Sequence, residues 1–306
     1  MIAVCGEALI DLVTGSRVGA APGGGPFNTA RALARLGVET CFIGHLSTDV
    51  DGRQLAERLA ADGVDLSLAS YGPEPTTRAV ARVDEAGHAA YEFVVEGTAA
   101  PNLTAAMLPA RLGDEIRALH IGSLGLVMEP IGSTLMQLAL RESGRRLIML
   151  DPNIRTAVLG SGDSHRRRID SLMSISTIVK VSDSDVEWLF PGLGHEAAAR
   201  VIVERGARLA VVTLGEAGAF GVTAGAMARV TAPKVSVVDT IGAGDAFGAA
   251  LLAWLHESKK LSVGFNLSDR ELTSALEFAC EVASLTCTRA GADPPDYEEI
   301  RRSTRR

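Results

Sequence analysis

The residues best suited to chemistry form a short glycine-rich segment that contains one carboxylate. Gly242, Ala243 and Gly244 carry no bulky side chain, and an apolar run over 246–255 is expected to form a helix directly after them. A helix N-terminus presents unpaired backbone N–H groups and a partial positive charge, so this segment is suited to bind phosphate. Asp245 would be unfavourable beside phosphate unless it has a chemical role. The role we expect is to accept the proton of a hydroxyl that attacks phosphorus.

The same residues have a plainer interpretation, in which they form a strand-to-helix turn and Asp245 is only a helix N-terminal carboxylate. Valines at 235, 237 and 238 predict a strand before the turn. However, the stretch Asp-Thr-Ile-Gly-Ala-Gly-Asp-Ala-Phe at 239–247 resembles the C-terminal signature of the PfkB/ribokinase family of sugar kinases. The resemblance extends from residue 6 to residue 291, with the motifs in the family's order. It implies a ribokinase-like fold and Asp245 as the catalytic base.

A second glycine run lies near the N-terminus, where Gly23, Gly24 and Gly25 precede Asn28 and a predicted helix over 28–36. Glycines let a backbone approach a ligand closely, and an asparagine amide both donates and accepts hydrogen bonds, as sugar hydroxyls require. The alternative is a glycine turn with Asn28 as the helix N-cap. The run resembles the family's N-terminal signature, which lines the sugar pocket.

Further resemblances add polar residues to the predicted sugar and phosphate sites. By position Asp11 matches the aspartate that binds sugar hydroxyls in these kinases, and Asp-Pro-Asn-Ile-Arg at 151–155 resembles the fructokinase branch. Arg155 could neutralise phosphate charge or form a structural ion pair. Ser182 and Asp185 replace the asparagine and glutamate of a family motif that is linked to Mg²⁺ and phosphate. Asp185 would reach Mg²⁺ through water, or it could simply cap a helix.

The nucleotide site is implied by resemblance alone. Thr213, Gly215 and Gly218 match a family motif that contacts nucleotide phosphates and ribose, and the segment that begins near Cys280 resembles the wall of the adenine pocket. A monovalent-cation site is implied for Asp239 with the carbonyl of Ile241. The expected cofactors are therefore ATP and Mg²⁺, with K⁺ as an implied activator.

Apolar strand-like runs alternate with helical patterns along the whole chain. Strands are expected at 3–5, 41–44, 119–121, 147–150, 177–181 and 209–213, and helices at 54–61, 133–142 and 270–283. Apolar strands separated by helices predict a mostly parallel sheet that is covered on both faces, a three-layer α/β/α fold, with ligands at the carboxyl ends of the strands. Segments at about 9–20 and 76–97, the second a hairpin around 84–87, predict a small β lid. The rest of residues 1–306 is read as one domain.

Composition excludes some function classes. The 306-residue chain has a net charge of −7, which disfavours nucleic-acid binding, and no uninterrupted apolar stretch suggests a membrane span. The four cysteines lack metal-binding spacing and favour buried thiols in the cytoplasm. Neither a G-x-G-x-x-G fingerprint nor a P-loop is present.

Together these features predict an ATP-dependent kinase for a primary sugar hydroxyl, with D-fructose first and ribose, 2-keto-3-deoxygluconate or a nucleoside as alternatives. An NAD-linked oxidoreductase and a non-catalytic sugar-binding protein are the alternatives of another class. Exposed valines at 80, 94 and 95 suggest that the lid strands pair in a homodimer.

Overall fold

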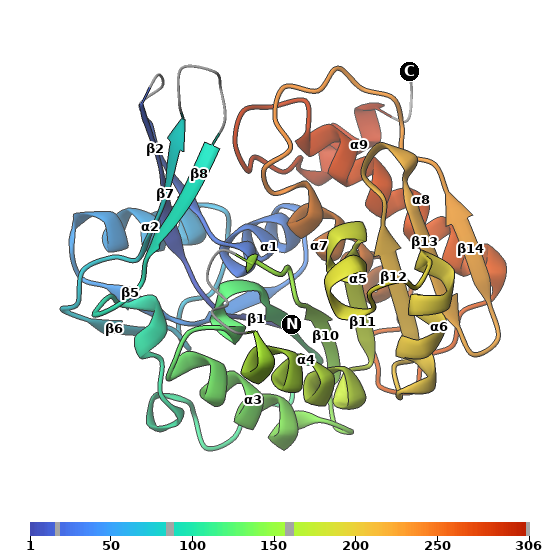
Figure 1. Ribbon diagram of the computed structural model, residues 1–306, viewed down its shortest axis with the longest axis horizontal. Helices are drawn as coiled ribbons and strands as arrows, with labels where there is room; N and C mark the ends of the chain where they lie inside the picture. Colours follow the sequence, from blue (N-terminus) through green and yellow to red (C-terminus); the bar gives the residue numbers. More distant parts are fainter. Residues whose placement is uncertain (16–18, 84–88, 157–161, 304–306) are drawn as a thin grey trace.

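A large central sheet organises the molecule, which we describe from a computed structural model over residues 1–15, 19–83, 89–156 and 162–303. The sheet runs through the middle of the molecule (Figure 1). It has eight strands, and six neighbouring strands run parallel. Their spatial order is β4 (Thr40–Ile43), β1 (Ile2–Cys5), β9 (Ala118–Gly122), β10 (Leu147–Asp151), β11 (Ile178–Ser182) and β12 (Leu209–Thr213). Two antiparallel strands complete the edge, β13 (Ala219–Thr223) and β14 (Met227–Val230).

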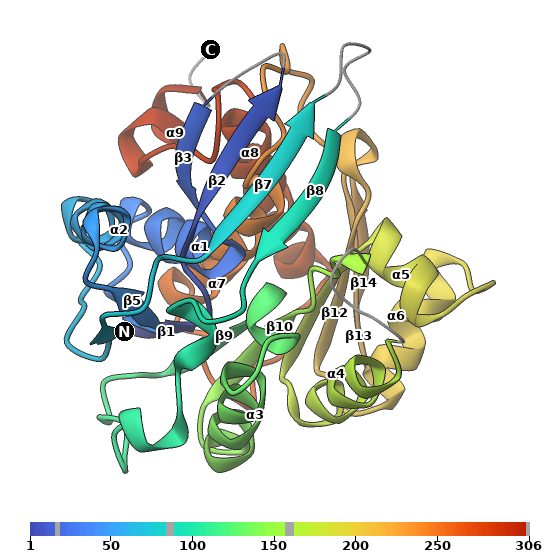
Figure 2. The same cartoon turned by 60° about the vertical axis from the view of Figure 1, so that its left-hand side comes forward.

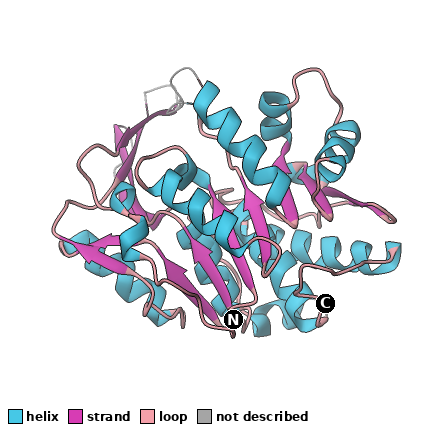
Figure 3. Cartoon of the chain, turned by 90° about the horizontal axis from the view of Figure 1, so that it is seen from below, coloured by secondary structure: helices cyan, strands magenta, loops and turns pink. Residues whose placement is uncertain are grey.

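Helices cover both faces of this sheet (Figure 3). Successive side chains of β1 point to opposite faces, so Val4 belongs to one apolar core and Cys5 to the other. The first core is covered by α1 (Gly25–Arg35), α2 (Val50–Ala61), α7 (Ala243–Glu257), α8 (Asp269–Thr286) and α9 (Tyr297–Ser303). The second is covered by α3 (Ile131–Glu142), α4 (Asp163–Ile175), α5 (Asp183–Leu189) and α6 (His195–Glu204). This is the predicted three-layer fold.

The predicted lid segments form a separate four-stranded sheet beside the main sheet (Figure 2). Its order is β3 (Gly19–Gly23), β2 (Leu9–Gly15), β7 (Arg78–Val83) and β8 (Ala89–Val94), with β2 and β7 parallel. The first segment therefore contains two strands and extends to Gly23. The second is an antiparallel pair as predicted, although its turn at 84–87 lies outside the described residues. A short parallel pair, β5 (His45–Ser47) and β6 (Ser70–Gly72), lies apart from both sheets.

Two local predictions are wrong. The valine-rich segment 235–238 is not a strand: the Val238 and Asp239 amides both donate to the Cys287 carbonyl, and Val237 is exposed. Strand propensity cannot act there because the segment lies against the end of α8 and not against a strand. Cys287 is partly exposed, whereas the other three thiols are buried as expected.

Candidate active site

The start of α7 is the centre of the site. Gly242 is the N-cap and has a left-handed backbone, with φ of 77°, which glycine adopts without strain. Ala243 donates its amide to the Thr240 carbonyl at 3.3 Å, whereas neither Gly242 nor Gly244 donates its amide to any group in the described part of the chain. These two amides can therefore bind an anion, and the helix dipole favours that binding.

Asp245 lies in the first turn of α7 and is 8 % exposed. Its carboxylate accepts a hydrogen bond of 2.9 Å from the side-chain amide of Asn28. Burial raises the pKa of Asp245 to about 6; the Asn28 hydrogen bond opposes the shift, Asp151 adds to it, and Lys180 and Arg155 oppose it. A carboxylate with this pKa is mostly ionised at pH 7 and can still accept a proton readily.

The packing of α1 against α7 brings Asn28 to this position. Asn28 is not an N-cap, because α1 begins earlier, at Gly25, with Gly24 as its cap. Gly24 has φ of 106°, and Pro26 fits the first helical turn, where its missing N–H removes no hydrogen bond. Asn28 therefore lies one turn into the helix with its side chain directed at Asp245.

A buried ion pair lies beside the helix start. Lys180 of β11 donates to Asp151 of β10 at 2.6 Å, and both side chains are almost fully buried. A Cβ atom on Gly244 would lie 3.4 Å from the Lys180 ammonium, so this cation is adjacent to the anion site. Burial disfavours the charged form of Lys180 and lowers its pKa. The negative charges of Asp151, Asp185 and Asp245 have the larger combined effect, so the pKa of Lys180 is raised.

All the predicted sugar residues except Gly23 line a cavity of about 570 Å³, and Asp245 lines it too. Its walls include Gly24, Gly25 and Asn28 from the N-terminal motif, Asp11 and Phe93 from the lid sheet, and Asn153 and Arg155 from the segment after β10. Burial raises the pKa of Asp11 to about 6, and the charge of Arg155 partly opposes the shift.

The glycines of the N-terminal motif are needed because other groups come very close to them. A Cβ atom on Gly23 would lie 2.0 Å from a carboxylate oxygen of Asp11. A Cβ atom on Gly25 would lie 2.9 Å from the Ser123 hydroxyl and 3.2 Å from the Asn153 amide. Side chains at these positions would displace groups that line the cavity.

All the predicted nucleotide residues except Ser182 line a second cavity of about 600 Å³. Thr213, Gly215, Gly218 and Cys280 all line it. The two cavities share Thr240 and Gly244. A phosphate chain in the second cavity could therefore extend to the Asp245 carboxylate in the first.

Ser182 and Asp185 are placed differently. Ser182 is the N-cap of α5, and its side chain and that of Asp185 form a reciprocal capping box. The Asp185 oxygens accept backbone N–H groups from Ser182 and Ile154, both at 2.8 Å. Burial raises the pKa of Asp185, and Asp151 adds to the shift. In the described residues neither side chain lines the nucleotide cavity.

At the predicted cation site, Asp239 makes hydrogen bonds that connect two loops. Asp239 accepts hydrogen bonds from the amides of Ile241 at 3.1 Å and Gly291 at 2.8 Å, so it joins the loop before α7 to the loop after α8. The described ranges contain no group of three or more His, Cys, Asp or Glu side chains that could hold a metal ion. Within those ranges no helix is long and apolar enough to cross a membrane.

Glu7 and the ion pair between Lys180 and Asp151 were not predicted from the sequence, although the segment 151–155 was expected beside the phosphate site. The sequence does contain a signal for this ion pair: Lys180 lies within an apolar predicted strand, and Asp151 directly follows another one. Glu7 is fully buried; one oxygen accepts the Gly125 amide at 2.7 Å and the other has no partner in the described chain. Burial raises its pKa to about 7 against the hydrogen bonds that it accepts.

Comparison with known proteins agrees with this geometry. Residues 1–299 match the pfkB family of carbohydrate kinases. A fructokinase from Rhizobium leguminosarum bv. trifolii is 42% identical over 86% of this chain and 82% of its own length. The structure of aminoimidazole riboside kinase from Salmonella enterica with aminoimidazole riboside and an ATP analog is 27% identical, with a TM-score of 0.85 over 98% of each chain. Fructokinase from Vibrio cholerae O395 with fructose, ADP and calcium ion is 26% identical, with a TM-score of 0.85 over 98% of this chain and 97% of that one. The chain belongs to the pfkB family of carbohydrate kinases.

Proposed function

We propose that this protein transfers the γ-phosphoryl group of ATP to a primary hydroxyl of D-fructose and forms fructose 6-phosphate and ADP. The observation that best supports the proposal is the junction of two cavities at the start of α7. A buried carboxylate, Asp245, and two open amides lie at that junction. The 42% identity to a fructokinase supports fructose as the acceptor.

In this mechanism Asp245 removes the proton of the sugar hydroxyl as its oxygen attacks the γ-phosphorus. The new O–P bond forms while the bond from phosphorus to the β,γ-bridging oxygen breaks, and ADP leaves with that oxygen. Asn28 holds the Asp245 carboxylate in place by its 2.9 Å hydrogen bond. General-base assistance of this kind contributes about 10²–10⁴ in rate.

Positive groups around the junction would stabilise the charge on the transferring phosphoryl group. The amides of Gly242 and Gly244 donate to its oxygens, and the Ala243 amide joins them when it leaves the Thr240 carbonyl. Lys180 adds a cation below Gly244. Arg155, an exposed residue that lines the sugar cavity, adds a second cation.

Metal ions would be held by side-chain oxygens close to the same place. One Asp151 oxygen is buried without a partner in the described structure, and Asp185 carries a second buried carboxylate. Such oxygens suit Mg²⁺, which is commonly held by one or two carboxylates, water and nucleotide phosphates. Bound there, Mg²⁺ would neutralise phosphate charge. K⁺ would be held by Asp239 and the Ile241 carbonyl.

An ADP-release assay with ATP and Mg²⁺ tests the proposal. The acceptors are fructose, ribose, 2-keto-3-deoxygluconate, adenosine and fructose 6-phosphate, each measured in K⁺ and in Na⁺. We expect turnover with fructose that exceeds turnover with the other acceptors, and a higher rate in K⁺. Preferred turnover of another acceptor would replace fructose as the substrate, and folded protein that does not bind ATP would contradict the kinase mechanism.

A further inference from the structure

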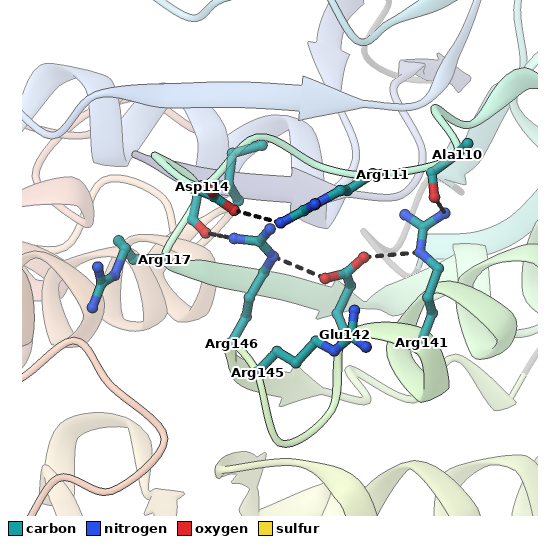
Figure 4. Close-up of a pocket in the computed structure, with 9 residues that line it drawn as sticks. Ala110, Arg111, Asp114, Arg117, Arg141, Glu142, Arg145 and Arg146 are labelled. Atoms are coloured by element: carbon teal, nitrogen blue, oxygen red, sulfur yellow. Dashed lines mark hydrogen bonds and ion pairs between the residues drawn. The ribbon is translucent and has the colours of Figure 1, made fainter.

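An arginine-rich cavity (Figure 4) has a volume of about 370 Å³ and lies far from the catalytic residues. The segment before β9 and the end of α3 surround it, so it lies at the amino ends of the parallel strands. The catalytic groups follow the carboxyl ends, and a five-residue strand such as β10 separates the two edges by roughly 16 Å. Five arginines and two acids line the cavity: Arg111, Arg117, Arg141, Arg145, Arg146, Asp114 and Glu142.

Some of these charges have a structural role. Glu142 is buried and accepts hydrogen bonds of 2.8 Å from both Arg141 and Arg146. Arg146 also donates to the carbonyls of Ile116 and Leu112. This network joins the end of α3 to the segment before β9. Arg146 and Glu142 therefore build the cavity wall and are not available to a ligand.

Other hydrogen-bond donors of the cavity have no partner in the described part of the chain. One terminal nitrogen of Arg141 is buried and has no hydrogen-bond partner in the described part of the chain. Arg117 and Arg145 are exposed, and neither forms a side-chain hydrogen bond or ion pair with the described residues. Arg111 forms an ion pair with Asp114 at 3.3 Å, but both side chains are more than three-quarters exposed. Such an exposed ion pair contributes little to stability. The cavity thus has an excess of three positive charges in a chain of net charge −7.

We propose that this cavity binds a small phosphate monoester. Guanidinium groups match phosphate oxygens in a bidentate geometry and are always charged, so several of them around one hollow repel each other until an anion is bound. A phosphate dianion would neutralise most of the excess charge. The volume suits a phosphate group with a sugar-sized body.

Binding can be measured without turnover, so the result does not depend on the proposed kinase reaction. We would titrate the full chain with glucose 6-phosphate by calorimetry at low ionic strength, with glucose as the uncharged comparison. The test variant is Arg117→Gln/Arg145→Gln, which removes two exposed, unpartnered cations. The matched control is Arg208→Gln, another exposed arginine without a side-chain partner in the described chain, outside the cavity.

We expect glucose 6-phosphate to bind with a dissociation constant below about 1 mM, and glucose not to bind detectably. The double variant should bind about tenfold more weakly or worse, since charged hydrogen bonds to phosphate are lost, and 0.5 M NaCl should weaken binding similarly. The control should bind like the unmodified protein, and kinase turnover should be unchanged in both variants. Absence of saturable binding would overturn the proposal. So would equal affinity in the double variant, or displacement of glucose 6-phosphate by ADP, which would place the ligand in the active site.

Discussion

Three carboxyl groups of the sugar cavity have pKa values raised by burial, to about 7 for Glu7 and about 6 for Asp11 and Asp245. Desolvation disfavours the ionised form of each, and it is the largest cause in every case. Such groups are unfavourable for stability, so their presence together in one cavity is best explained by binding and proton transfer. In the proposed mechanism Asp245 is the base and Asp11 is an acceptor for sugar hydroxyls, and both roles need the ionised form.

The first prediction concerns the pH dependence of kcat/KM for fructose. Two carboxylates with pKa near 6 must both be ionised, so log kcat/KM should rise with pH at a slope of about 2 below pH 5.5 and level off above pH 7. Asp11→Asn should lower kcat/KM and reduce the slope to about 1, since only Asp245 then titrates. The measurement is an initial-rate series between pH 4.5 and about 8. A slope of about 1 in the unmodified protein would mean that Asp11 can bind sugar when protonated.

The second prediction separates catalysis from stability at Asp245. Asp245→Asn should lower turnover by about 10²–10⁴ or more, because an amide cannot accept the proton. The raised pKa means that the folded state binds the proton more tightly than the unfolded state. Ionised Asp245 therefore destabilises the fold above about pH 6, and this penalty disappears as the pH falls toward 4.

The Asp245→Asn variant should consequently unfold at a higher urea concentration than the unmodified protein at pH 7. Its free energy of unfolding should be higher by up to about 3 kcal/mol. The gain should shrink at pH 5, where the unmodified carboxyl is largely protonated in the folded state. Urea unfolding at both pH values checks this, and ATP binding by calorimetry serves as the control for the site. Loss of folding or of ATP binding would assign Asp245 a structural role.

At the scale of elements, strand β3 positions the sugar site through its last glycine. Gly23 pairs with Leu9 of β2, and the Asp11 carboxylate lies against Gly23 across the strand pair. No positive φ is required at Gly23. Its lack of a side chain therefore matters only because Asp11 occupies the space.

The third prediction is that Gly23→Ala raises the KM for fructose at least tenfold while the KM for ATP stays within about twofold. The new methyl group would lie 2.0 Å from an Asp11 oxygen, and that short side chain must rotate away. The matched control is Gly19→Ala in the same strand, where a Cβ atom has no neighbour within 4 Å among the described residues. Steady-state kinetics of both variants measure the effect. An equal change in both would point to a general effect on β3 and not to Asp11.

Elements that are strongly apolar could be predicted from the sequence, and weakly marked ones could not. The strands at 119–121 and 147–150 are continuous apolar runs, and β9 and β10 contain them. The start of α1 was placed too late because glycine and proline give no helical signal before Asn28. The segment 235–238 has strand-forming residues, but no strand lies beside it, and only tertiary contacts decide that.

The site could be predicted where a motif is contiguous. Asp245 and its glycines lie within four residues, whereas Lys180 and Asp151 are 29 residues apart and meet only through the pairing of β10 with β11. The Asn28–Asp245 hydrogen bond spans 217 residues. Local patterns contain no information on such contacts. The arginine cavity was missed for the same reason, since its two segments come together only in the fold.

At the scale of the whole molecule, the sugar cavity lies between two sheets. Asp11, Leu12 and Phe93 come from the four-stranded sheet, whereas Asn153 and Asp245 belong to the main body. A sugar in this cavity would contact both parts at once. Movement of the smaller sheet toward the main body would exclude water, which otherwise competes with the sugar as the phosphoryl acceptor.

The last prediction is that fructose reduces amide hydrogen exchange in β7 and β8 while ADP alone leaves it unchanged. A ligand at one hundred times its dissociation constant stabilises the bound state by about 2.7 kcal/mol, so amides that exchange only when the small sheet opens should slow by up to about hundredfold. Exchange measured by mass spectrometry on peptides that cover 78–83 and 89–94 tests this, with α6 as an internal reference far from the cavity. Asp245→Asn should show the same protection, because it removes the base and leaves the sugar contacts of both sheets. If fructose binds and these strands exchange as before, the four-stranded sheet is a fixed wall of the cavity, and water must be excluded by the sugar itself.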